Sequence, residues 1–220
     1  MKAFVSFAVL AAVFIVAQSC DLHPSFTTDL YRVSGITNKT APGHKVELLN
    51  ITYDSVGQRT LTYYQSYTAK YGTAVLRLYR EKVLYAIDYV ERACKKAPQT
   101  TDFVIPSLPE TASSERSAIV PGAQAAENIV VQEYVFNQMG KEFTVAVHLS
   151  LPDCFPVIAY KFEGDLIGKA PAVHLQQSLY FFNYRPSATA GVFVLPSFCG
   201  SAINVTEEEI RNEFEEVTFF

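Results

Sequence analysis

The sequence contains no tryptophan, few charged residues and none of the short motifs that mark common catalytic sites. Charged residues make up 18% of the chain, below the ~25% usual in soluble proteins. The net charge is −4 and no run of Lys or Arg stands out, so the electrostatic signature of a nucleic-acid-binding protein is missing. Nucleophile elbows, phosphate-binding glycine loops and zinc-protease helices are also absent.

No pair of side chains in the sequence stands out as a nucleophile and its base. The histidines occur in separate contexts: His23, His44, His148 and His174. We therefore predict that the protein is not an enzyme and requires no cofactor, with a secreted hydrolase as the disfavoured alternative. Calcium is the one ion to consider, because acidic residues cluster near the end of the chain: Glu207, Glu208, Glu209, Glu213, Glu215 and Glu216. This cluster lacks the spacing of an EF-hand, so a solvated helix face is the simpler interpretation and the metal ligands are unknown.

The first nineteen residues are typical of a secretory signal peptide. Lys2 supplies the positive start, residues 4–16 form an apolar run, and Ala17-Gln18-Ser19 is a small-x-small cleavage site. The apolar run is shorter than the ~20 residues needed to cross a bilayer, which disfavours a retained anchor. A bacterial lipoprotein signal before Cys20 is a weaker alternative, because Gln18 fits it poorly. The sequence predicts an exported, extracellular protein.

Four cysteines would remain after cleavage, at Cys20, Cys94, Cys154 and Cys199, and no two are spaced as a zinc or redox pair. In an oxidising compartment they predict two disulfides, with free buried thiols as the alternative. Three glycosylation sequons begin at Asn38, Asn50 and Asn204. We expect at least one to carry a glycan, although each could also be an ordinary polar turn.

Alternating apolar and polar residues predict a mostly β structure. Residues 129–136 and 143–149 flank a turn and predict a hairpin, as do residues 46–53 and 59–65. Further strands are expected at 75–79, 83–90, 157–162, 179–184 and 192–195.

Two other segments depart from this strand pattern. Residues 97–122 carry four prolines and little periodicity, and are expected to form a long loop. Thr206 and Glu209 form a capping box that predicts a short helix to about Phe214. We expect a signal peptide at 1–19, one β domain at 20–200 and an acidic helical tail at 201–220.

The composition favours an apolar interior, since 13% of the residues are aromatic. Many antiparallel strands and few charges suit a curved sheet or barrel around a pocket for a hydrophobic ligand. A sandwich whose core is filled by its own side chains is the alternative, and periodicity does not distinguish the two.

Four stretches, at residues 53–59, 79–96, 154–157 and 195–199, together resemble the ependymin and ependymin-related proteins in order and spacing. They are YDSVGQR, YREKV through ID to CKK, CFPV and LPSFC, and their order and spacing match the family over most of the chain from Cys20 to Cys199. The lack of a further cysteine pair and of tryptophan departs from many members, so pocket shape and ligand do not transfer.

The resemblance implies a secreted glycoprotein in which two curved antiparallel sheets surround a hydrophobic pocket, as in bacterial lipoprotein carriers. It implies Cys20–Cys154 and Cys94–Cys199 disulfides, and a ligand pocket that includes Tyr85, Ile87, Val145 and Val147. It also implies possible homodimers and an association with calcium and the extracellular matrix. The function predicted here is binding of a lipid-like ligand; the alternative is a calcium-associated matrix or adhesion protein without a dedicated ligand.

Overall fold

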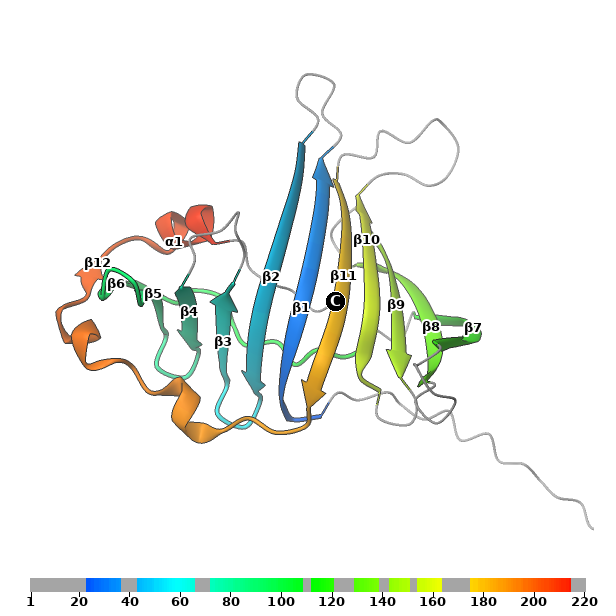
Figure 1. Ribbon diagram of the computed structural model, residues 1–220, viewed down its shortest axis with the longest axis horizontal. Coiled ribbons are helices and arrows are strands. Elements are labelled where there is room, and N and C mark those ends of the chain that lie inside the picture. Colours follow the sequence, from blue (N-terminus) through cyan, green and yellow to red (C-terminus); the bar gives the residue numbers. More distant parts are fainter. Residues whose placement is uncertain are drawn as a thin grey trace, which may run out of the picture.

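The described part of the chain forms a single twelve-stranded sheet (Figure 1). The computed structural model describes residues 23–36, 43–65, 72–108, 112–120, 129–138, 143–150, 154–163 and 175–214. The strands are β1 (Ser25–Ile36), β2 (Gly43–Asp54), β3 (Arg59–Tyr64), β4 (Thr73–Leu78), β5 (Val83–Asp88), β6 (Ala93–Pro98), β7 (Ser113–Val120), β8 (Ile129–Gln138), β9 (Phe143–Ser150), β10 (Pro156–Glu163), β11 (Leu175–Arg185) and β12 (Ile203–Asn204). The helices are the 3-10 turns η2 (Ala190–Phe193) and η3 (Ser197–Ser201) and the α-helix α1 (Glu207–Glu213).

The central pair of the sheet, β1 and β11, joins two runs of antiparallel strands. The order across the sheet is β12-β6-β5-β4-β3-β2-β1-β11-β10-β9-β8-β7. All neighbours are antiparallel except β12, which lies parallel to β6. Because β1 pairs along its length with β2 on one side and β11 on the other, it ties the two runs into one continuous sheet.

The predicted mainly β, curved architecture with a short C-terminal helix is confirmed, but the expected two sheets are one. The cause is the long pairing of β1 with both neighbours, which links what would otherwise be two separate layers. The two predicted hairpins are present as β2–β3 and β8–β9. The capping box at Thr206 is also present, with reciprocal bonds between Thr206 and Glu209.

Two predicted elements are wrong. The apolar run at 192–195 is not a strand: η2 ends at Phe193, whose ring packs on the sheet beneath the Arg59 guanidinium, 4.3 Å from its centre. The expected loop at 97–122 contains the end of β6 and all of β7. The sequence of β7 begins with five polar residues, SSERS, so alternation did not reveal it.

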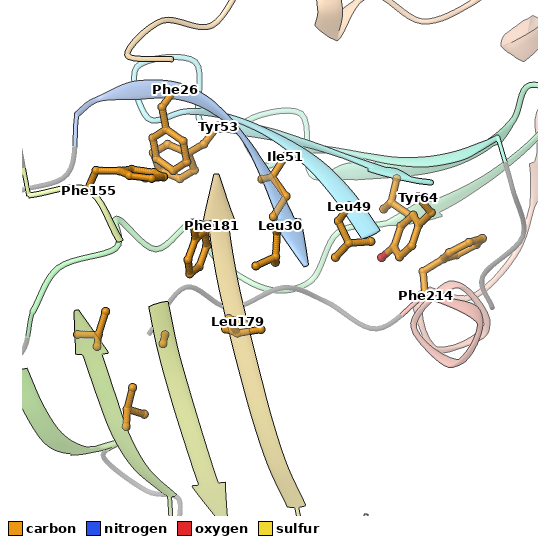
Figure 2. Close-up of a cluster of buried hydrophobic side chains, with 14 of the residues drawn as sticks. Phe26, Leu30, Leu49, Ile51, Tyr53, Tyr64, Phe155, Leu179, Phe181 and Phe214 are labelled. Atoms are coloured by element: carbon orange, nitrogen blue, oxygen red, sulfur yellow. The ribbon is translucent and has the colours of Figure 1, made fainter. Parts of the chain in front are cut away.

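The two faces of the sheet carry different cores. We call the face with Leu30, Leu49 and Leu179 the inner face, and the opposite face the outer face. Figure 2 shows inner-face side chains from several strands pointing toward a common interior, with Phe214 after α1 approaching Tyr64 from the other side. A smaller cluster lies on the outer face, where Leu76 and Ile87 pack against Phe193 and the Cys94–Cys199 disulfide.

The C-terminal segment wraps around the β6 edge of the sheet. Residues 190–201 contact the outer face through η2 and η3, β12 then pairs with β6, and α1 packs on the inner side. Ile210 and Phe214 of this segment are completely or almost completely buried. The wrap covers an edge strand that would otherwise present unpaired backbone groups. Along the described residues, no helix is long and apolar enough to span a membrane.

Candidate ligand-binding face

The inner face changes character along the strands, from aromatic at one end to polar at the other. At the aromatic end Phe26 stacks on Tyr53 with ring centres 5.1 Å apart, and Phe155 stacks on Tyr184 at 3.7 Å. Phe103, from the segment after β6, stacks on Tyr53 at 5.4 Å. Burial raises the pKa of the Tyr53 hydroxyl, so this side chain adds no charge to the aromatic end.

Apolar, mostly aliphatic side chains form the middle of the face. Leu30 of β1 lies opposite Leu49 of β2 and Phe181 of β11. One row further along, Leu179 of β11 neighbours Ala159 of β10, which in turn neighbours Val147 of β9. These six side chains are at most 5% exposed. The register therefore produces a continuous apolar band from β2 to β9.

A polar row follows on the same face. Ser34, Gln177 and Lys161 lie in register across β1, β11 and β10, and all three are buried. Beside them Arg32 of β1 donates from Nε to Glu47 of β2 at 2.7 Å, with both side chains at most 2% exposed. Lys45 adds a second cation to the same carboxylate at 2.9 Å. The face is thus amphipathic along the strand direction.

The four predicted pocket residues do not come together. Val145 and Val147 lie on the inner face and belong to its main cluster. Tyr85 and Ile87 lie on the outer face, packed with the Cys94–Cys199 disulfide. On β5 it is Leu84 and Ala86 that face inward, because the pairing of Ala86 with Val75 sets the strand's parity.

The predicted Cys94–Cys199 disulfide is present, with Cα atoms 5.2 Å apart. Cys154 is also in a disulfide and is buried in the main cluster. Its expected partner, Cys20, lies outside the described residues, so that pairing stays a prediction.

The sequons occupy different environments. Asn50 is half-buried within β2, and its side-chain amide donates to Asp29 at 2.8 Å. Asn204 is exposed on the short edge strand β12. Asn38 and the predicted signal peptide at 1–19 lie outside the described residues.

The described glutamates of the acidic cluster are largely committed to contacts within the chain. Glu207 accepts from Thr100 and Arg211, Glu209 caps α1, and Glu213 pairs with Lys95 at 2.6 Å. Within the portion of the chain that the structure describes, no group of three or more His, Cys, Asp or Glu is placed to hold a metal.

The sequence was compared with models of known protein families. The family model for ependymin matches residues 67–199, from before β4 to the second disulfide cysteine. The chain belongs to the ependymin family. No curated protein matches this family member in a sequence search.

One solved bacterial structure shares the fold of this ependymin-family chain. An uncharacterized conserved protein from Thermus thermophilus has a TM-score of 0.52 at 12% identity, over 84% of this chain and 92% of that one. A LolA superfamily protein from Nitrosomonas europaea has a TM-score of 0.38 at 8% identity, over 80% and 92%. The first likeness establishes a shared fold and nothing about function.

The sequence predicted strands at the positions of β2, β9, β10 and β11 of this ependymin-family chain, but it missed β1, a central strand of the inner face. Burial alternates along residues 26–34. The inward positions, however, include Thr28, Arg32 and Ser34 as well as Phe26 and Leu30. A strand whose buried side is partly polar gives no apolar alternation. The available signal for a strand was that Phe26 and Leu30 are an even number of residues apart, which places both on the same face.

Proposed function

We propose that this protein is a secreted glycoprotein that binds a hydrophobic, lipid-like ligand at the inner face of its sheet. The observation that carries the proposal is the continuous apolar band of Leu30, Leu49, Phe181, Leu179 and Val147, flanked by stacked aromatic rings (Figure 2). Apolar surface of this kind must be covered by another layer or by a ligand.

Among the described elements, α1 and the segment after β6 lie over part of the inner face. Helix α1 has seven residues, so it is about 10 Å long. Twelve strands spaced about 4.8 Å apart span roughly 50 Å along the sheet. In the described structure α1 packs near β6 and Tyr64, and the segment after β6 adds Phe103 and Leu108. The side chains of the band are at most 5% exposed, so a flexible apolar ligand would have to take the place of part of the chain that now packs on the band.

Two adjacent residues of β11 allow a matched test. Phe181 is 5% exposed on the inner face, whereas Phe182 is 40% exposed on the outer face. The chain has no tryptophan, so Phe181→Trp and Phe182→Trp each introduce a single fluorescent reporter on one face. We expect a brominated fatty acid to quench the Phe181→Trp emission saturably and to leave Phe182→Trp almost unchanged.

The unbrominated fatty acid, added first, should protect Phe181→Trp from quenching. Circular dichroism of both variants checks that each retains the wild-type fold. Quenching of neither reporter, or equal quenching of both, would contradict binding at the inner face. Tyr184→Trp, at the partly buried aromatic end, provides a second inner reporter if Phe181→Trp does not fold.

Secretion rests on the predicted signal peptide and is supported by the disulfides, which persist in oxidising compartments. The calcium-associated matrix role, and the homodimer, stay predictions. Of the acidic cluster, Glu207, Glu209 and Glu213 already bond within the chain. Calorimetric titration with calcium tests that alternative: stoichiometric heat would favour it over the carrier proposal.

A further inference from the structure

A hollow lies on the outer face, at the opposite end of the sheet from β7. It has a volume of ≈ 550 Å³ and is bounded by β5, β6, β12 and the η3 segment, including Tyr85, Lys96, Pro196, Cys199 and Asn204. This volume is in the range of small-molecule sites. The Cys94–Cys199 disulfide fixes one wall, because it ties η3 to β6.

Three of the lining residues form one row across the sheet. Tyr85 of β5 pairs with Lys96 of β6, and Lys96 pairs with Asn204 of β12. Residues paired in register place their side chains on the same face. The Lys96 ammonium lies 5.7 Å from the centre of the Tyr85 ring. An aromatic ring, a cation and an exposed asparagine therefore border the same hollow.

Asn204 is also the first residue of a sequon, Asn204-Val205-Thr206. We propose that Asn204 carries an N-linked glycan and that its first sugars occupy this hollow, against the Tyr85 ring. The inference rests on the proposed secretion, because the modifying enzyme lies in the secretory pathway.

The transfer itself precedes folding. The Asn204 side-chain nitrogen attacks the anomeric carbon of a lipid-linked diphosphate oligosaccharide. The new C–N bond replaces the C–O bond to the phosphate, the lipid diphosphate leaves, and the amide loses one proton to a base of the transferase. In the folded chain the Thr206 hydroxyl accepts a hydrogen bond from the Glu209 amide, so the sequon threonine is engaged in capping α1. Folding then brings Asn204 beside the hollow.

The chemistry of the hollow suits a sugar. The C–H groups on one face of a pyranose carry partial positive charge and pack on the negative face of a tyrosine ring. The Lys96 ammonium donates hydrogen bonds to the sugar hydroxyl and acetamide oxygens. By contrast, Asn50 lies within the sheet, and its side-chain amide donates to Asp29. A glycan on Asn50 would therefore have no comparable hollow to occupy.

The test uses the full chain secreted from animal cells. Glycopeptide mass spectrometry should find Asn204 occupied. A peptide N-glycosidase should then remove this glycan slowly from the native protein and quickly after denaturation. In Tyr85→Ala we expect native removal to be about tenfold faster, since the aromatic contact is lost.

Tyr31→Ala is the matched control, because Tyr31 is also an outer-face tyrosine and is 40% exposed, but it is not among the residues bordering the hollow. Its glycan should be removed at the wild-type rate. Lys96→Met gives a second variant if Tyr85→Ala does not fold, and it too should speed removal. Equal rates in wild type and both pocket variants would overturn the proposal.

The outcome also separates this inference from the proposed function. A chain that is not exported contradicts the proposed secretion. An exported chain with a bare Asn204 contradicts only the glycan proposal. Quenching of the Phe181→Trp reporter should be unchanged by Asn204→Gln, because the inner face does not include the hollow.

Discussion

The ion pair of Arg32 and Glu47 lies between β1 and β2, with both side chains almost completely buried. The free-energy cost of removing two charges from water offsets most of the attraction between them, so such a pair adds little net stability. Removing one partner is different, because the other charge stays buried. The pair also stands where the inner face changes from apolar to polar.

We predict that Glu47→Gln lowers the free energy of unfolding by about 3–5 kcal/mol, because it removes the carboxylate shared by Arg32 and Lys45. Urea denaturation measures this change. Asp102→Asn is the control, since Asp102 and Lys82 form an exposed pair, and its unfolding midpoint should barely move. Similar midpoints for the two variants would refute the argument from burial.

Glu207 makes the docking of α1 depend on pH. Burial alone would raise the pKa of this carboxyl, but hydrogen bonds from Thr100 and the ion pair with Arg211 outweigh it and lower the pKa. A lowered pKa means that the contribution to stability is present above the unfolded value of 4.5 and is lost as pH falls through the folded value. Acid should therefore weaken the contact between α1 and the segment after β6.

We predict that Glu207→Gln lowers stability at pH 7 and reduces the fall in stability below about pH 4.5. Thermal unfolding of the wild type and the variant between about pH 3 and pH 7 measures both effects. Glu208→Gln, at the neighbouring exposed position, should follow the wild-type curve. A Glu207→Gln curve parallel to the wild type at all pH values would rule out this linkage.

At the scale of elements, the C-terminal segment holds three parts of the fold together. It packs η2 and η3 on the outer face, adds β12 beside β6 and places α1 on the inner face. The Cys94–Cys199 bridge anchors this segment, and its cysteines are 105 residues apart in the sequence. The wrap therefore depends on one covalent contact as well as on packing.

We predict that Cys94→Ser with Cys199→Ser lowers the free energy of unfolding on the order of 4 kcal/mol, since a long loop is no longer closed in the unfolded chain. Limited proteolysis should then cut residues 186–202 first. Ser197→Ala, at an exposed site of η3, is the control and should resist cleavage like the wild type. Unchanged protection in the double variant would show that packing alone holds the segment.

The elements that sequence predicted best are those whose local signals agree with the fold. The β2–β3 and β8–β9 hairpins follow from alternation around a turn, and α1 follows from the Thr206 capping box. The face assignment failed on β5, where Tyr85 and Ile87 were expected in the pocket but Leu84 and Ala86 face inward. Both parities of β5 are apolar, so only its pairing with β4 decides which side is buried.

At the scale of the whole molecule, the described strands form one continuous sheet where two sheets were expected. The central pairing of β1 with β11 was not visible in the sequence, because it joins strands from opposite ends of the chain. That pairing brings Leu30 beside Phe181 and so creates the apolar band proposed to hold the ligand (Figures 1 and 2). Composition and the family resemblance both favoured a hydrophobic ligand site, but the strand register was needed to locate it.

Native mass spectrometry of the protein purified from the medium of secreting cells tests the central claim most directly. The account predicts that the folded protein carries a stoichiometric apolar molecule, which is released on denaturation and is recovered in an organic extract. After extraction and refolding, an added fatty acid should restore the mass shift in a saturable manner. A native mass equal to that of the glycosylated chain alone, with no uptake of added fatty acid, would contradict it.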